Sequence, residues 1–172
     1  MKIRTLHWYA LYLRSRFEKR VAAELQQKQV ETFLPLIEEV HNWSDRKKKV
    51  EEPLFRGYVF VRTDVRNKEA ILQTDGVVKF VSIREVPSPI PENQIEWLRR
   101  IIGDPEKIKR ENYFDVGERV RVTSGPLLGV EGIITRHQTE TRVVISLSAI
   151  AQSVSVQVPA NLLEIIAPVS NR

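Results

Sequence analysis

The segment RKKKVEEPLFRGYVFVR, residues 46–62, contains the strand from which the rest of the fold can be placed. Its second half is rich in β-branched and aromatic residues, which predicts a β-strand. Side chains alternate between the two faces of a strand, so Val59 and Val61 point to one face. Tyr58 and Phe60 point to the other face. Both faces are apolar, so we expect the valines to lie in a core. The aromatic pair then needs a second cover, either the protein's own helices or a partner.

The bulk composition limits the class of protein. The chain has 172 residues, enough for one medium domain or two small ones. It has no cysteine, which excludes disulfides and thiolate metal sites and is typical of a reducing compartment. No apolar run approaches the roughly 20 residues that span a bilayer. The first residues alternate apolar with polar and lack a small-residue cleavage site. We therefore expect a cytoplasmic, monomeric protein without a membrane segment.

The positive charge is unevenly distributed. The net charge is +5, and all of the excess lies within residues 1–102, because the remaining residues hold equal numbers of cations and anions. Such an excess is common on ordinary protein surfaces, but it also suits a polyanionic partner.

Strands and helices alternate through residue 102. The segment 8–13 reads as a buried strand, and Ser15 precedes Glu18 by three residues, which predicts a capping box and a helix starting near Arg16. A second strong helix signal covers 91–102. This alternation predicts an α+β domain over residues 1–102.

The composition changes after residue 102. Residues 103–114 are polar and aperiodic, which predicts a linker. Residues 115–168 contain five short alternating runs separated by turn signals and no convincing helix. Short strands at regular spacing are typical of a small β-barrel.

The sequence shows no pattern of a catalytic or metal site. His7, His41 and His137 are far apart, so no two histidines stand at the spacing of a metal-binding pair. The glycines between 125 and 132 lack the Lys-Ser/Thr of a phosphate loop. No nucleophile motif appears. We therefore expect a binding protein with no catalytic residue, metal or cofactor, and not an enzyme.

Three segments of the first part resemble the N-terminal (NGN) domain of NusG-type transcription elongation factors: WYALYLRSRFEKRVAAEL, PLFRGYVFVR and GVVKFVSI. In the second part, VGERVRVTSGPLLGVEGIITRH resembles the family's KOW motif. The segment NWSDRKKKVEEPLF is closer to the specialised RfaH- and UpxY-type paralogues than to housekeeping NusG. The resemblance implies an antiparallel sheet flanked by helices, followed by an SH3-like five-stranded barrel.

The resemblance also implies a function. The N-terminal domain would bind the clamp helices of RNA polymerase and promote processive elongation and antitermination of specific operons. It would also touch the non-template DNA strand, and the KOW domain would recruit a small-subunit ribosomal protein or the termination factor Rho. Two alternatives remain open: a housekeeping factor that couples polymerase to Rho or the ribosome, and a ribosome-associated RNA-binding KOW protein.

Matching the family's motifs position by position implies a polymerase-binding set and a KOW partner-binding set, and the clustering of cations along the chain gives candidates for a DNA-binding set, for which a solvated surface is the alternative. The polymerase-binding set is Tyr12, Phe55, Tyr58, Phe60 and Phe80. The DNA-binding set is Arg14, Arg16, Lys19 and Arg20 beside the first helix, with Arg46, Lys47, Lys48 and Lys49 at a hairpin tip. The KOW partner-binding set is Leu128, Ile150, Ala151 and Gln152.

Two positions depart from the family pattern. Arg56 stands where the family has proline in Phe-Pro-Gly-Tyr, which adds a charge beside the aromatic set. Residues 150–152 stand where the family commonly has Phe-Gly-Arg, which puts recruitment of Rho or the ribosome in doubt.

Overall fold

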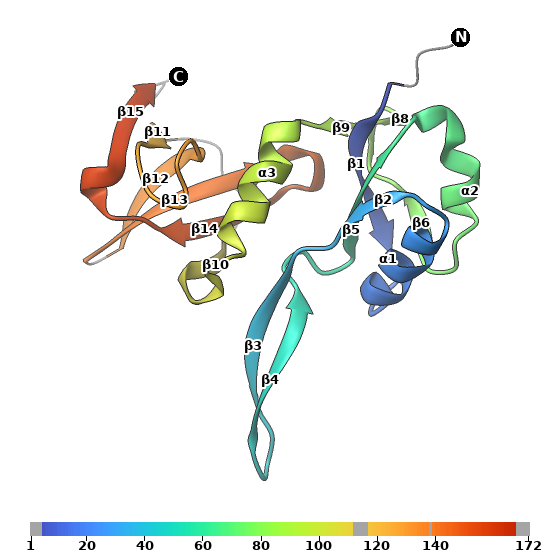
Figure 1. Cartoon of the computed structure of the whole chain (residues 1–172), viewed down its shortest axis with the longest axis horizontal. Coiled ribbons are helices and arrows are strands. Elements are labelled where there is room, and N and C mark those ends of the chain that lie inside the picture. The colour runs from blue at the N-terminus through green and yellow to red at the C-terminus, as the bar shows by residue number, and fades with distance from the viewer. Residues whose placement is uncertain (1–4, 112–116, 138, 168–172) are drawn as a thin grey trace. The chain divides into compact units, whose positions relative to one another are not determined.

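The computed structural model describes residues 5–111, 117–137 and 139–167. The chain divides into two compact units, Met1–Glu92 and Asn93–Arg172 (Figure 1). The helical and strand segments of the first unit are β1 (His7–Leu13), α1 (Glu18–Gln27), β2 (Glu31–Phe33), β3 (Leu36–Asn42), β4 (Lys47–Pro53), β5 (Tyr58–Thr63), η1 (Val65–Asn67), α2 (Lys68–Leu72), β6 (Val77–Phe80), β7 (Ser82–Ile83), β8 (Val86–Pro87) and β9 (Pro89–Ile90).

The first unit is built on an antiparallel sheet. Its strand order is β2-β5-β1-β6, and β9 pairs with β1. The strand predicted from residues 58–63 is β5, and it lies between β1 and β2. Val59 and Val61 belong to the core cluster with Val21 and Leu25 of α1, as the alternation predicted. The apolar stripe of α1 therefore covers one face of the sheet.

Helix α1 begins later than predicted. Arg16 has a φ of 65°, in the left-handed region, so it cannot belong to a right-handed helix. The residue before the helix, Phe17, makes no side-chain cap. The carboxylate of Glu18 is buried and accepts a hydrogen bond from the backbone N–H of Gly57 at 2.8 Å. The predicted capping box with Ser15 is therefore wrong, because this carboxylate holds the start of α1 against the segment that leads into β5.

Strands β3 and β4 form a separate two-stranded ribbon. Their register runs from Leu36 opposite Pro53 to Asn42 opposite Lys47. The turn is closed by a hydrogen bond of 2.9 Å from the Trp43 N–H to the Arg46 carbonyl. Figure 1 shows this ribbon extending away from the main sheet of the first unit.

The second unit is mostly a six-stranded antiparallel sheet with strand order β10-β14-β13-β12-β11-β15. Helix α3 (Glu92–Ile101) begins at the boundary between the units. The remaining segments are η2 (Pro105–Lys107), β10 (Ile108–Glu111), β11 (Arg119–Val122), β12 (Glu131–His137), β13 (Glu140–Leu147), η3 (Ser148–Ile150), β14 (Gln152–Gln157), η4 (Ala160–Leu162) and β15 (Leu163–Ala167). The expected fold class, an NGN-type α+β part followed by a β-rich part, is confirmed, and strands β11 to β15 match the five predicted runs.

The sixth strand, β10, was not expected. It lies within the segment 103–114 that the sequence predicted as a linker, and residues 112–114 of that segment lie outside the described residues. Ile108 is buried and pairs with Val156 of β14. The sequence did not predict this strand because its composition is polar. The side chains that contact its polar residues come from β13 and β14, which lie far away in the sequence.

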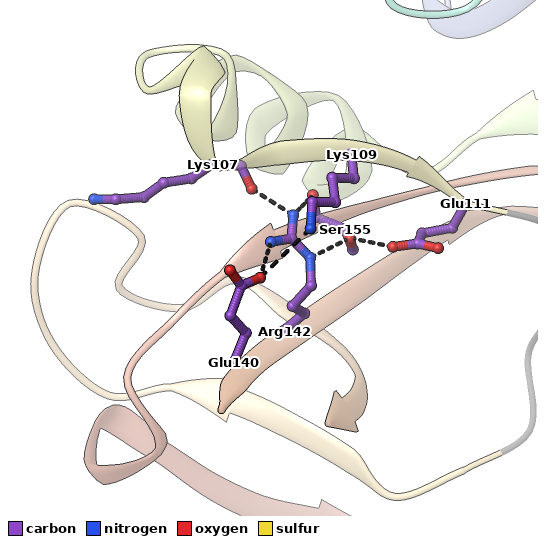
Figure 2. Close-up of polar contacts among 6 residues, drawn as sticks. All are labelled: Lys107, Lys109, Glu111, Glu140, Arg142 and Ser155. Carbon is purple, nitrogen blue, oxygen red and sulfur yellow. Dashed lines mark hydrogen bonds and ion pairs between the residues drawn. The ribbon is translucent and has the colours of Figure 1, made fainter. Parts of the chain in front are cut away.

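Those side chains surround Arg142, which is 2% exposed (Figure 2). Its guanidinium donates to the Ser155 hydroxyl at 2.7 Å, to the Ser155 carbonyl at 3.1 Å and to the Lys107 carbonyl at 2.5 Å. It also lies 3.3 Å from the carboxylate of Glu140. The Ser155 hydroxyl in turn donates to the Glu111 carboxylate at 2.6 Å. Arg142 thus holds Lys107 directly and is linked to Glu111 through the Ser155 hydroxyl.

Candidate functional site

Two tyrosines form an accessible pair at one end of the main sheet. Tyr12 of β1 lies opposite Tyr58 of β5 in the antiparallel register, and their ring centroids are 5.6 Å apart. Tyr12 is 42% exposed, and Tyr58 is partly exposed. The pKa of the Tyr58 phenol is raised, first by burial and then by the neighbouring Tyr12. The pair therefore presents two neighbouring aromatic rings at the surface.

The other three residues of the predicted polymerase-binding set are buried. Phe60 packs edge-on against Phe55, with centroids 5.8 Å apart, and stacks on Phe33 at 6.1 Å. Phe80 belongs to the core cluster and meets Tyr9 edge-on at 5.9 Å. The five predicted residues therefore do not form one exposed patch. Phe55 and Phe60 lie beneath the surface, and Phe80 is in the core that α1 covers.

The cations beside α1 are exposed, and two of them are paired. Arg14 and Arg20 both form ion pairs with Asp75, and the Arg20 pair measures 3.1 Å. Their guanidinium carbons lie 4.5 and 5.3 Å from the centroid of the Phe17 ring. These two arginines thus form an ordered cluster around one aromatic ring, with a single carboxylate shared between them.

Arg16 and Lys19 line a groove beside Tyr12. The groove has a volume of about 690 Å³, and its far wall is the end of β4 with Arg56. The Lys19 ammonium crosses it and donates to the Glu51 carbonyl at 2.7 Å. Arg56, the residue that departs from the family pattern, forms an ion pair of 3.2 Å with Glu39 of β3. Cations from three different segments are thereby gathered around one end of the tyrosine pair.

The second predicted group of cations occupies the end of the β3–β4 ribbon. Arg46 lies in the turn, and Lys47, Lys48 and Lys49 are the first residues of β4. All four are exposed, as expected for a hairpin tip. Trp43 lies beside them and was not in the predicted set, although an aromatic residue three positions before a cation run is a signal that the sequence contains.

The four predicted KOW residues differ in accessibility. Leu128 is 54% exposed and Ile150 is buried. Ala151 is exposed and ends η3 in the left-handed region with a φ of 50°. Gln152 begins β14, where it pairs with Leu147. Leu128 and Ala151 are therefore the accessible members of this set.

No three histidine, aspartate or glutamate side chains gather at metal-binding distance in the described part of the chain. Within the same residues, no helix combines the length and the apolar character needed to cross a bilayer. The site is thus made of aromatic and cationic side chains, which bind by packing and by charge.

Comparison with known proteins adds independent findings. Residues 6–99 match the family model described as transcription termination factor NusG. The transcription termination/antitermination protein NusG of Haemophilus influenzae is 29% identical over 164 residues, covering 87% of this chain and 89% of that protein. The protein of the same name from Pasteurella multocida is 28% identical over 171 residues, covering 91% of this chain and 93% of that protein.

A solved structure of Thermotoga maritima NusG, titled for the interaction of its domains, has a similar fold. The TM-score is 0.57 and the identity is 23%, over 95% of this chain and 98% of that one. Since the family model covers more than half of the chain, this protein belongs to the NusG family of transcription termination and antitermination factors.

Proposed function

We propose that this protein is a monomeric, cytoplasmic elongation factor that binds the clamp helices of RNA polymerase and promotes processive transcription of specific operons. Family membership supports a role in transcription termination or antitermination. The assignment to a specialised RfaH- or UpxY-type paralogue is part of the proposal, because the relatives named above are NusG proteins.

The single observation that carries the polymerase contact is the exposed Tyr12–Tyr58 pair. Val59, Phe60 and Val61 of the neighbouring β5 strand are buried, so the two tyrosine rings are accessible beside an apolar part of the sheet. Tyrosine is enriched at the energetic centres of protein interfaces. Phe55 and Phe60 would act indirectly, because their edge-on packing lies beneath the pair. Phe80 would have a purely structural role in the core.

Copurification with core RNA polymerase tests this contact. The double substitution Tyr12→Ala with Tyr58→Ala removes both rings, and each ring at the centre of an interface contributes about 2 kcal/mol or more. We expect the complex to be lost while the circular dichroism of the free protein is kept. Ile83→Ala, which shortens an even more exposed apolar side chain on β7, is the control and should bind normally. Unchanged binding by the double variant would refute the contact.

The two groups of cations are proposed to contact the non-template DNA strand. Phosphate contact needs only charge and donors, and the exposed cations beside α1 and on the ribbon supply both. The cations beside α1 are Arg14, Arg16, Lys19 and Arg20, and the ribbon supplies Arg46, Lys47, Lys48 and Lys49. Replacing the ribbon's four cations by alanine should remove DNA crosslinking in an elongation complex and leave polymerase affinity unchanged. Crosslinking that persists would refute the role of the ribbon.

The KOW unit is proposed to recruit a second protein through Leu128 and the loop of Ile150, Ala151 and Gln152. Leu128 and Ala151 are accessible, and the left-handed Ala151 fixes the loop's shape. Capture of purified Rho and of the small-subunit ribosomal partner on the immobilised protein distinguishes the candidates. Leu128→Ser should weaken capture of the true partner, and binding of neither protein would refute this part of the proposal.

A further inference from the structure

The tip and the base of the β3–β4 ribbon carry opposite charges. The base holds four glutamates: Glu38, Glu39, Glu51 and Glu52. Lys49 forms an ion pair of 3.5 Å with Glu38, so the last cation of the run is neutralised by the base. Within the described residues, no ion pair joins Arg46, Lys47 or Lys48 to a carboxylate. The tip therefore concentrates three cations at the end of an extended ribbon.

Trp43 lies among these cations. It is 56% exposed, and its backbone closes the turn by the bond to the Arg46 carbonyl. The Lys48 ammonium lies 5.9 Å from the indole centroid, on the same face of the ribbon as the side chain of Trp43. An indole held at a tight turn, with the Lys48 ammonium near its ring and two further cations in the same turn region, combines the two features that bind single-stranded nucleic acid: a flat stacking surface and positive charge for the backbone.

We propose that Trp43 stacks on a base of single-stranded DNA while Arg46, Lys47 and Lys48 contact the flanking phosphates. This contact deepens the DNA binding proposed above and depends on it. A duplex offers no free base face to an indole, so the strand must be single. The three cations without a carboxylate partner favour a polyanion over an apolar protein surface, because a protein partner would have to bury them or neutralise them.

A direct test measures the fluorescence anisotropy of a labelled dT oligonucleotide of about 12 nucleotides with the full chain. A stacked base contributes about 1–3 kcal/mol, so Trp43→Ala should weaken binding by roughly 5- to 100-fold. Trp43→Phe keeps an aromatic face and should stay within about threefold of the parent protein. Ile83→Ala removes apolar surface of similar exposure elsewhere in the same unit and should change nothing.

The salt dependence separates stacking from charge. Replacing Arg46, Lys47 and Lys48 by glutamine should lower the slope of log K against log salt by about 2, since each phosphate contact on a single strand contributes roughly 0.7. Trp43→Ala should leave that slope unchanged, because an indole releases no counterion.

The intrinsic tryptophan fluorescence gives a further check. Oligonucleotide binding should quench the parent protein, and Trp43→Phe should lose that quenching, because Trp8 is buried and the third tryptophan, Trp97, is only partly exposed and lies on α3, outside the ribbon.

Four results would overturn the proposal: equal affinity of Trp43→Ala and the parent, absence of dT binding, tighter binding of the corresponding duplex, and tighter binding of a uridine oligonucleotide.

Polymerase copurification of Trp43→Ala should be normal. Its loss would place Trp43 in the polymerase interface and refute stacking on DNA. Conversely, failure of the tyrosine-pair test with normal Trp43 results would leave the DNA contact standing without the proposed polymerase contact.

Discussion

Replacing Arg142 by methionine should release β10 from β14 without unfolding the rest of the second unit. Methionine fills a similar volume, so the change removes the polar contacts and leaves little cavity. The substitution removes three hydrogen bonds, to the Ser155 hydroxyl, the Ser155 carbonyl and the Lys107 carbonyl. The ion pair with Glu140 adds less, because that carboxylate is 40% exposed and is screened by solvent.

The expected magnitude follows from these contacts. Each lost hydrogen bond contributes about 1 kcal/mol net, and more where the donor is charged. We therefore expect local opening of β10 to become easier by about 3 kcal/mol, a factor of roughly 100 in the opening equilibrium. Amide hydrogen exchange of the peptide covering 108–111 reports this equilibrium directly. Exchange in that peptide should accelerate by the same factor, while β12 and β13 stay protected.

Arg121 provides the matched control. It also bridges two carboxylates of the same sheet, with Glu131 at 2.7 Å and Glu164 at 3.1 Å, but its side chain is 45% exposed. Exposed pairs contribute little because solvent screens them, so Arg121→Met should change exchange by far less than Arg142→Met does. Exchange of β10 within twofold of the parent in Arg142→Met would refute the reasoning. Equal loss of protection across the whole sheet would also refute it, because the network would then hold the sheet and not β10.

Three further predictions concern single positions. Gly132→Ala should destabilise the second unit by more than about 2 kcal/mol in urea denaturation, because the new Cβ would lie 2.3 Å from a backbone carbonyl oxygen of β13. Gly125 has open space around it, so Gly125→Ala should cost only about 1 kcal/mol of stability, for its positive φ. Equal destabilisation by the two alanine substitutions would contradict the steric argument. Glu18→Ala should lower the free energy of unfolding by about 1–3 kcal/mol because it leaves the Gly57 N–H unpaired, whereas Glu18→Gln should retain most of the stability. Unchanged stability of the alanine variant would count against this hydrogen bond. The raised pKa of Tyr58 means that the folded state holds its proton longer than the unfolded state, so this stabilisation is complete below about pH 10 and lost as the pH rises through the folded pKa. Tyr58→Phe should flatten that alkaline loss in melting curves, and an unchanged slope would contradict the assignment.

The strands of this protein are well predicted from sequence because their patterns are local. The alternation of residues 58–63 correctly assigned Val59 and Val61 to the core. The helix start was predicted wrongly, since the Ser15–Glu18 spacing is that of a capping box. The competing partner of that carboxylate, the Gly57 N–H, lies far away in sequence, and no local pattern reveals it.

The candidate site was predicted less completely, and for the same reason. Alternation places Tyr58 and Phe60 on one face but does not show that Phe33 stacks on the second ring and Phe55 abuts it. Accessibility depends on these tertiary neighbours. Likewise, a cation run predicts a basic tip but does not show which members are neutralised. That distinction appears only when Glu38 is placed across the ribbon from Lys49.

Strand β10 has a consequence for how this protein avoids aggregation. An unpaired sheet edge is a template on which a second chain can add a strand. Pairing with β10 removes that edge from β14 and moves it to a strand whose exposed residues, Lys109 and Arg110, are both cations. Charged edge strands discourage such pairing. A fragment beginning at residue 115, the predicted start of the KOW domain, would expose β14 and should self-associate, whereas one beginning at residue 105 should stay monomeric in sedimentation experiments.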